Sequence, residues 1–149
     1  MLPVFWSLKS WSQLGVDQLY EILRLRTEVF VVEQECPYQE VDGKDQESWH
    51  LMGFAQGKLI AYARLLPPGL HYEEASIGRV VTAPDQRGTG LGRLLMEEAI
   101  ARIPELFNSR SIRIEAQSQL EQFYGSLGFI IQSEQYLLDG IMHTEMLFE

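Results

Sequence analysis

Cysteine is almost missing from this chain of 149 residues, in which Cys36 is the single example. An internal disulfide is therefore excluded, and we expect a protein of the reducing cytoplasm. No activating partner for Cys36 is evident, so we interpret it as a packed or incidental thiol rather than a nucleophile. The histidines His50, His71 and His143 lie far apart in the sequence. Because no Cys/His cluster has metal-ligand spacing, we expect no metal site.

Long apolar runs and basic segments are missing as well. No stretch approaches eighteen consecutive apolar residues, so we expect no membrane-spanning helix and no membrane partner. The N-terminus shows no basic region followed by an apolar core, which argues against a secretion signal. Twelve Lys and Arg against 21 Asp and Glu give a formal net charge of −9. This excess of negative charge argues against nucleic acid and mildly favours a cationic partner.

The remaining composition fits a single domain that spans residues 1–149. At 46% hydrophobic residues the chain is long enough to bury a sizeable core. It contains no internal repeat, low-complexity run or linker. The sequence leaves the oligomeric state open, and a homodimer is one arrangement that it allows.

Hydrophobic periodicity predicts an alternation of strands and helices. Strands are expected at 4–8, 50–55, 59–66, 75–82 and 111–116, with a final pair around an Asp139-Gly140 turn. Helices are expected at 14–30, from 91 to near Pro104, and at 120–127. Residues 33–48 read as a long loop or broken helix. The order predicts an α/β (α+β) fold with a mixed sheet and helices on both faces.

A glycine-rich loop joins the strand at 75–82 to the helix that begins at 91. Arg87 precedes three alternating glycines, Gly88, Gly90 and Gly92, which let the backbone approach a ligand closely. The helix that follows leaves its first amides unpaired and carries a partial positive charge at that end. The loop therefore predicts a site for a phosphate or pyrophosphate. The alternative is a connection that merely turns the chain.

Two well-known phosphate loops fit poorly. A P-loop needs Gly-Lys-Ser/Thr, whereas Gly92 is followed by Arg93 and Leu94. The dinucleotide fingerprint would place its third glycine at residue 93, which is an arginine. Glu115 does lie roughly where a ribose-binding acid is expected, so spacing alone does not exclude a nucleotide-binding protein. The absence of βαβ alternation over the first eighty residues counts against it more strongly.

The loop instead resembles the acetyl-CoA pyrophosphate loop of the GNAT superfamily of N-acetyltransferases. Arg87, Gly90 and Gly92 fill its Arg/Gln-x-x-Gly-x-Gly/Ala pattern in register. A second block, residues 117–129, resembles the superfamily's Asn-x-x-Ala-x-x-x-Tyr-x-x-x-Gly-Phe helix. Gln117 and Leu120 replace the first two pattern residues. The two motifs occur in the expected order, separated by one helix and one strand.

A narrower resemblance lies upstream, in residues 26–34 (Arg-Thr-Glu-Val-Phe-Val-Val-Glu-Gln), Pro37-Tyr38, Asp42 and His50-Leu51. These residues are similar to the ElaA-like subgroup of small bacterial GNAT proteins. The resemblance runs from about residue 5 to the end. It implies a mixed, mostly antiparallel central sheet with helices on both faces, but it does not imply an acceptor.

The resemblance also implies how acetyl-CoA is bound as a co-substrate. The fourth strand would give backbone hydrogen bonds to the pantetheine arm, and the loop amides would hold the pyrophosphate. Gln117 stands where an asparagine often bonds the coenzyme. The residues implied for the coenzyme are Val80, Val81, Thr82, Arg87, Gly88, Thr89, Gly90, Leu91, Gly92, Gln117 and Tyr124.

Transfer of an acetyl group to an amine requires two proton movements. An alkylammonium has a pKa of about 10.4, so some group must accept its proton before attack. The leaving thiolate, whose thiol has a pKa of about 8.5, is better expelled if it is protonated. Tyr124 matches the superfamily's tyrosine, and we predict that it is this acid. The alternative interpretation of Tyr124 is a core aromatic residue.

The base and the acceptor side are less defined. Glu33, His50 and Glu115 are the candidates for the base, together with a water relay, and His50 also reads as a structural histidine. Arg79 is predicted to bind an acidic group of the acceptor or a neighbouring carboxylate. The six acids between residues 33 and 47 are either an entrance for a cationic amine or a solvated surface loop.

The sequence therefore predicts an N-acetyltransferase that moves an acetyl group from acetyl-CoA to a primary amine of a small molecule or peptide by direct transfer. A non-catalytic acyl-CoA-binding sensor or interaction module on the same fold is the main alternative, because a fold does not fix a function. A nucleotide-binding protein is a third.

Overall fold

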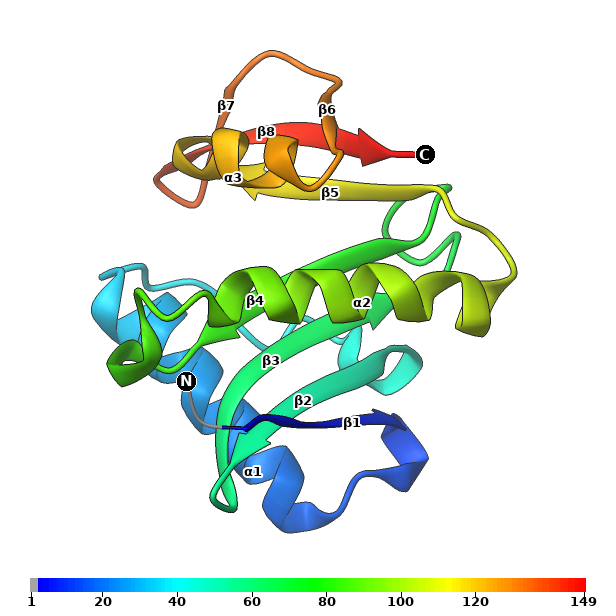
Figure 1. Ribbon diagram of the computed structural model, residues 1–149. Helices are drawn as coiled ribbons and strands as arrows, with labels where there is room; N and C mark the ends of the chain where they lie inside the picture. The colour runs from blue at the N-terminus through cyan, green and yellow to red at the C-terminus, as the bar shows by residue number, and fades with distance from the viewer. Residues whose placement is uncertain (1–2) are drawn as a thin grey trace.

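The computed structural model describes residues 3–149, which form two antiparallel sheets (Figure 1). The first sheet has the order β1-β2-β3-β4, and the second has the order β5-β8-β6 with β7 also paired to β8. The strands are β1 (Phe5–Ser10), β2 (Trp49–Ala55), β3 (Lys58–Leu66), β4 (Ser76–Thr82), β5 (Ile112–Gln117), β6 (Ile130–Ile131), β7 (Tyr136–Leu138) and β8 (Ile141–Phe148). The helices are α1 (Val16–Arg26), α2 (Leu91–Phe107) and α3 (Glu121–Ser126).

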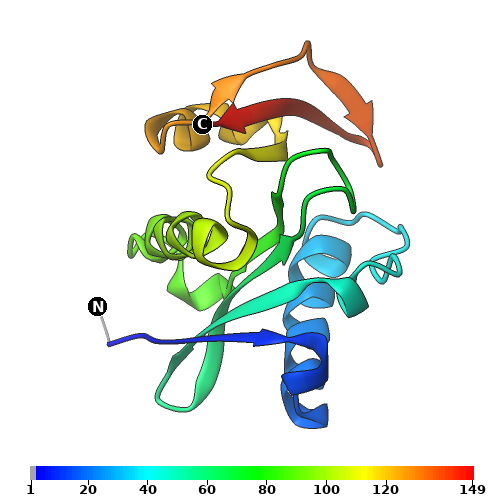
Figure 2. The same cartoon turned by 90° about the vertical axis from the view of Figure 1, so that its right-hand side faces the viewer.

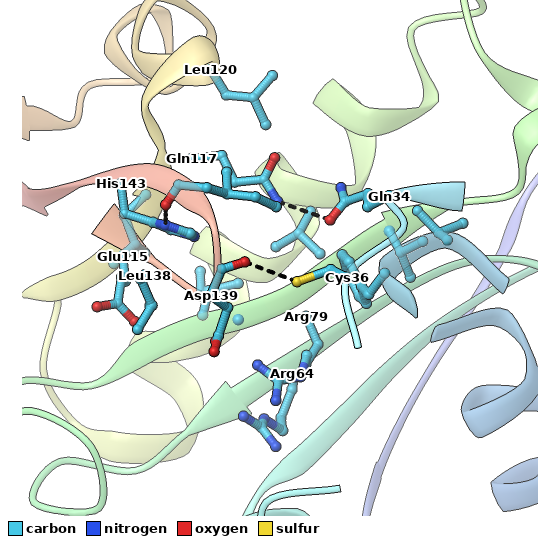
Figure 3. A pocket seen from close by; sticks show the side chains of 18 of the residues that line it. Gln34, Cys36, Arg64, Arg79, Glu115, Gln117, Leu120, Leu138, Asp139 and His143 are labelled. Carbon is cyan, nitrogen blue, oxygen red and sulfur yellow. Dashed lines mark hydrogen bonds between the residues drawn. The ribbon is translucent and has the colours of Figure 1, made fainter. Parts of the chain in front are cut away.

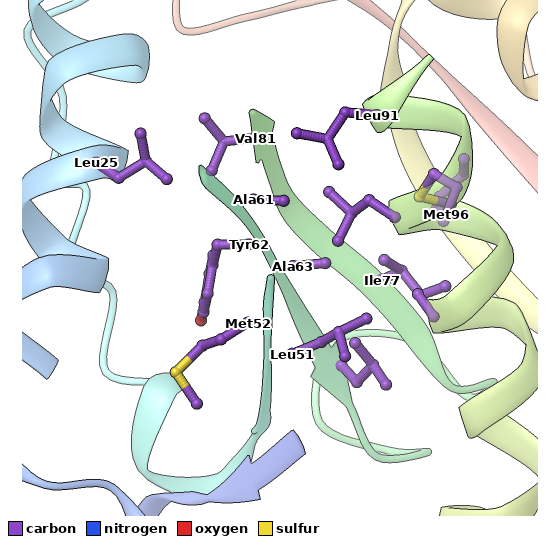
Figure 4. Close-up of a cluster of buried hydrophobic side chains, with 14 of the residues drawn as sticks. Leu25, Leu51, Met52, Ala61, Tyr62, Ala63, Ile77, Val81, Leu91 and Met96 are labelled. Carbon is purple, nitrogen blue, oxygen red and sulfur yellow. The ribbon is translucent and has the colours of Figure 1, made fainter. Parts of the chain in front are cut away.

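Helices cover both faces of the first sheet, as predicted. In Figure 2, α1 and α2 lie on opposite sides of it. Figure 4 shows that apolar side chains are buried on both faces of this sheet, with Tyr62 and Met52 on the α1 side and Leu91 and Met96 on the α2 side. Strand β3 is buried at every position from Leu59 to Leu66, because both of its faces are covered. Such strands read as continuous apolar runs rather than as alternating ones.

The sheet is divided, which the sequence did not reveal. A parallel bridge between Ala75 and Ile112 connects the end of the first sheet to the second, and the amide of Arg113 donates to the carbonyl of Ala75 over 2.9 Å. Beyond this point β4 and β5 diverge. The two sheets therefore leave a wedge-shaped opening between β4 and β5.

A bulge in β4 contributes to this divergence. In the β3–β4 register Arg64 pairs with Gly78 and Tyr62 pairs with Val81, so Arg79 and Val80 together face one residue of β3. Arg79 has a φ of 50°, which is unusual for a residue with a side chain. A bulge bends its strand and leaves the extra residue out of the ladder.

Two helices end three residues later than predicted. The first helix changes at Arg26 into a π-helical segment, Thr27–Glu33, so helical backbone runs to Glu33 rather than ending at 30. Helix α2 passes through Pro104 and ends at Phe107, before Asn108 in the left-handed conformation. A proline within the last turn of a helix removes one backbone hydrogen bond but need not end it.

Candidate functional site

A cavity of about 770 Å³ occupies the opening between the two sheets (Figure 3). Its walls come from β4, the end of β5, α3, the start of α2, β8 and the segment that follows α1. Ten predicted residues line it: Glu33, Arg79, Val80, Val81, Thr82, Arg87, Gly92, Glu115, Gln117 and Tyr124. The structure thus gathers residues from both sequence motifs around one space.

One wall is the free edge of β4. Between Ile77 and Thr82, no strand among residues 3–149 pairs with the side of β4 that faces β5. An edge strand presents a row of unpaired N–H and C=O groups. The side chain of Val81 is buried in the core, so it is the backbone of this strand that offers contacts to a ligand. An extended, amide-containing chain fits such an edge by strand-like hydrogen bonds.

The glycine loop lies at one end of the cavity. Gly88 and Gly90 have φ values of 77° and 83°, which a residue with a Cβ rarely adopts. Gly90 caps α2, and its carbonyl accepts from the amide of Leu94 over 3.2 Å. The amides of the first helical turn, Leu91 and Gly92 among them, have no acceptor within the helix. Gly92 lines the cavity, whereas Gly88, Thr89, Gly90 and Leu91 lie beside it.

Glu33 and Arg87 form an ion pair at this same end. Arg87 donates two hydrogen bonds of 2.5 Å to the Glu33 carboxylate, and both side chains are partly exposed. The hydrogen bond from Arg87 lowers the pKa of Glu33, although burial opposes it. Glu33 therefore lies beside the glycine loop and is engaged there as a carboxylate, which does not favour its candidacy as the base.

Tyr124 of α3 both packs and faces the cavity. Its ring makes edge contacts with Phe123 and Phe129, at centroid distances of 5.1 and 5.9 Å, and it is 7% exposed. Burial raises the pKa of Tyr124 to about 12, so its phenol keeps its proton at neutral pH. Tyr124 thus packs as a core aromatic residue and also lines the cavity, and its role as the acid stays a prediction.

Arg79 belongs to a closed ring of three arginines and three acids below the cavity. Each acid joins two arginines: Glu40 accepts from Arg26 at 2.6 Å and Arg79 at 2.9 Å. Asp42 accepts from Arg64 at 2.8 Å and Arg79 at 3.4 Å. Asp45 accepts from Arg26 at 2.9 Å and Arg64 at 3.0 Å. Of the two partners predicted for Arg79, the structure shows the neighbouring carboxylates.

The ring changes the interpretation of the acidic loop. Glu40 and Asp45 are buried and Asp42 is half-buried, and each is neutralised by two guanidinium groups. The expectation that this loop attracts a cationic amine by unpaired negative charge is therefore wrong for these three acids. Their role is to anchor the loop to the bulge in β4, because a buried charge must be paired.

His50 does not reach the cavity. It is 0% exposed, donates from Nε2 to the carbonyl of Asp45 over 2.9 Å, and accepts at Nδ1 from the hydroxyl of Tyr62 over 2.7 Å. Burial lowers its pKa, so it remains neutral. The structural interpretation of His50 fits its position, and its assignment to the acceptor side is not supported.

Glu115 projects from the polar face of β5 into the other end of the cavity. The side chain of His71, whose Nε2 lies 3.8 Å from the carboxylate, and Tyr136, which donates over 2.6 Å, outweigh the effect of burial and lower the pKa of Glu115. Glu115 is therefore an anion at neutral pH and a weak base. As an anion it is suited to hold a cation.

His143 is a cavity residue that the sequence did not point out. The β5–β8 register places it opposite Gln117, and it stacks on Tyr136 at a centroid distance of 6.3 Å. Figure 3 shows it beside Glu115 and Leu138. A single histidine on a strand carries no spacing signal, and its neighbours Tyr136 and Gln117 are brought to it only by strand pairing.

The segment after the π-helix crosses the opening at two points. Gln117 donates to Gln34 over 3.3 Å, and the thiol of Cys36 donates to the carbonyl of Asp139 over 3.0 Å (Figure 3). These contacts join the segment to the second sheet and close one side of the cavity. They also engage Gln117 with a protein partner.

Within residues 3–149, no helix is long and apolar enough to cross a membrane. No group of three or more His, Cys, Asp and Glu side chains there is arranged to hold a metal ion.

Comparison with known proteins identifies the family of this chain. Residues 9–149 match the model of the acetyltransferase (GNAT) domain. Protein ElaA of Escherichia coli is 40% identical over 143 residues, which are 95% of this chain and 94% of ElaA. The crystal structure of ElaA covers 99% of this chain and 100% of its own, with a TM-score of 0.92. A structure of an acyl-CoA N-acyltransferase from Pseudomonas aeruginosa is 44% identical, covers 97% of this chain and 99% of its own, and has a TM-score of 0.91.

The family model spans most of the chain, and the identities extend over nearly its whole length. The glycine loop, the free edge of β4 and the tyrosine of α3 meet at one cavity within that span. The chain belongs to the GNAT acetyltransferase family and resembles its ElaA-like members.

Proposed function

We propose that this protein is an acetyl-CoA-dependent N-acetyltransferase that acts on a primary amine of a small molecule or peptide by direct transfer. The observation that carries the proposal is one cavity lined by the edge of β4, by the start of α2 and by Tyr124. Coenzyme A has three matching parts, namely an anionic pyrophosphate, an extended chain with amide groups, and a terminal thiol.

The coenzyme would lie along β4. Its pyrophosphate would meet the amides of Arg87, Gly88, Thr89, Gly90, Leu91 and Gly92, where the helix end favours negative charge. Its pantetheine amides would pair with the backbone of Val80, Val81 and Thr82, and Gln117 would lie near the end of the arm. The volume of about 770 Å³ is within the range of small-molecule sites.

Tyr124 would supply the proton for the leaving group. A neutral amine attacks the thioester carbonyl carbon, a C–N bond forms, and the C–S bond breaks. The thiolate takes the phenolic proton of Tyr124, and the phenolate recovers a proton from the nitrogen of the new amide. A phenol whose pKa is raised to about 12 is still protonated when the thiolate departs.

A covalent intermediate on Cys36 is not part of this proposal. The thiol of Cys36 donates its hydrogen to the carbonyl of Asp139 and is itself buried. Nucleophilic catalysis by cysteine needs a thiolate and a group that stabilises it.

Glu115, an anion that lines the cavity, is suited to bind the ammonium form of the acceptor.

The alternative is an acyl-CoA-binding sensor on the same fold. A thiol-release assay with acetyl-CoA and a panel of alkylamines, polyamines and lysine peptides separates the two functions. An N-acetyltransferase releases CoA thiol in proportion to an added amine, and the amine gains an acetyl group by mass spectrometry. Tight binding of acetyl-CoA by calorimetry, without thiol release for any amine in the panel, would favour the sensor.

A further inference from the structure

The imidazole of His143 is held in one defined tautomer. Its Nδ1 lies 2.7 Å from the carbonyl oxygen of Ile141. A carbonyl oxygen only accepts, so Nδ1 carries the hydrogen and donates it. In the neutral ring Nε2 is then the unprotonated nitrogen, with a lone pair available to an incoming proton.

Glu115, Tyr136 and Asp139 lie around the imidazole of His143 (Figure 3). Glu115 lies on the same polar face of the second sheet, and the positive form of His143 lowers the pKa of that carboxylate, after the larger effects of His71 and Tyr136. Tyr136 stacks on the ring, and Asp139 lies in the turn before β8 (Figure 3). Glu145, two residues further on β8, is engaged by Arg113 over 3.2 Å.

Three carboxylates and one further histidine of the cavity have other partners. Glu33 is held by Arg87, and Asp42 is held by Arg64 and Arg79. Glu115 has a lowered pKa and would hold a proton poorly. His71 is exposed at the rim, where its Nε2 faces Glu115. His143 therefore combines an oriented lone pair with a position in the cavity wall.

We propose that His143 is the general base of the reaction, and that its Nε2 removes one proton from the ammonium group of the acceptor. The inference rests on the proposed N-acetyltransferase function and adds a catalytic residue to it. The proton balance is complete: the ammonium loses one proton to Nε2 and becomes the attacking amine. Nε2 later gives that proton to water. The proton that Tyr124 gives to the thiolate is replaced by one from the nitrogen of the new amide, so Tyr124 ends the cycle protonated.

The test compares His143→Asn with the matched variant His71→Asn. Asparagine can keep a donor toward the carbonyl of Ile141 but has no group at the place of Nε2. We expect kcat/KM for the amine to fall about 10²-fold or more in His143→Asn, the size of a general-base effect. The acid limb of its pH profile should disappear, and acetyl-CoA affinity should stay unchanged. His71→Asn should keep the acid limb. An unchanged acid limb in folded His143→Asn would overturn the inference.

A second measurement does not depend on turnover. Nitrogen-15 NMR of histidine-labelled protein distinguishes the two neutral tautomers, and His143→Asn assigns the signal. We expect a protonated Nδ1 and an unprotonated Nε2 at high pH. The opposite tautomer would overturn the inference even in an active enzyme. Failure of the proposed function looks different, because the wild-type protein would then release no thiol with any amine.

Discussion

Glu33 and Arg87 are 54 residues apart in the sequence and form an ion pair of two hydrogen bonds beside the glycine loop. The arginine belongs to the loop that is proposed to receive the pyrophosphate. Its guanidinium is held by a carboxylate of the π-helical segment. A pyrophosphate would therefore compete with Glu33 for Arg87.

Removing the competing carboxylate should tighten coenzyme binding. In Glu33→Gln, Arg87 has no charged partner and is free for the pyrophosphate, so we expect the Kd for CoA to fall several-fold at low salt. This gain in CoA affinity should shrink as the salt concentration is raised, because the side chains of Glu33 and Arg87 are exposed to solvent. Isothermal titration calorimetry at two ionic strengths measures both effects.

The exposed neighbour Glu35 provides the control, since Glu35→Gln changes the net charge equally. An equal gain in both variants would indicate a general charge effect. Weaker CoA binding in Glu33→Gln would show that Glu33 holds Arg87 in its binding position instead.

Gly92→Val should block coenzyme binding without harming the fold. Gly92 lines the cavity, its φ is not positive, and a Cβ built there meets no atom within 4 Å. The valine methyl groups would project toward the place proposed for the pyrophosphate. We expect the Kd for CoA to rise by at least about tenfold, since a loss of 1.4 kcal/mol is tenfold in affinity.

Gly125→Val is the matched variant for that experiment. Gly125 is also a helical glycine with open space around its Cβ, but it does not line the cavity. It should bind CoA as the wild-type protein does. Equal affinities for the two folded variants, checked by circular dichroism, would remove the start of α2 from the coenzyme site.

Breaking the arginine–carboxylate ring should destabilise the protein. Glu40→Gln leaves Arg26, which is 0% exposed, and Arg79 without their shared carboxylate. Removing one partner of a buried ion pair costs about 3–5 kcal/mol of unfolding free energy. Urea denaturation measures this, with Glu47→Gln on the exposed side of the same loop as the control. A loss in Glu40→Gln no larger than in Glu47→Gln would contradict the account of the ring.

The ring also predicts the pH dependence of stability. Burial raises the pKa of Asp42, but hydrogen bonds and charge from Arg64 outweigh it and hold that pKa well below its usual range. A lowered native pKa adds stability that is present above the unfolded value, about 3.9, and is lost as the pH falls toward the native value. We expect the unfolding free energy to stay level from pH 7 to 5 and to drop below about pH 4. The Asp42→Asn variant should have a lower unfolding free energy at pH 7 and a smaller loss of it below pH 4. A pH dependence of the unfolding free energy that runs parallel to that of the wild-type protein would contradict this prediction.

Local patterns in the sequence predicted several residues that line the cavity. The alternating glycines mark the special backbone of the loop, where Gly88 and Gly90 have positive φ values, and Tyr124 stands at a fixed distance from Gly128 in a helical motif. Such features depend on a few neighbouring residues, so they are readable from one sequence. The alternation of Ile112 and Ile114 with Arg113 and Glu115 likewise predicted the half-buried strand β5.

The arginine–carboxylate ring and the surroundings of His143 were missed because they are built by pairing between distant segments. Arg26 meets Asp45, and Arg79 meets Glu40, only after the loop folds back under β4. The bulge that turns Arg79 toward this loop has no composition signal. The orientation of His143 depends on one backbone carbonyl, that of Ile141. Charge in the sequence therefore indicated an open acidic loop, whereas pairing in the fold neutralises most of it.

We propose that acetyl transfer to an amine takes place in the cavity, with Tyr124 as the acid. The most direct test follows labelled acetyl groups from acetyl-CoA to an amine by mass spectrometry, in wild-type protein and in Tyr124→Phe. We predict labelled N-acetylamine from the wild-type protein and a kcat about 10²-fold lower in the variant, with unchanged CoA affinity. The same rate of N-acetylamine formation in both proteins, or none in the wild-type protein despite bound acetyl-CoA, would contradict the account.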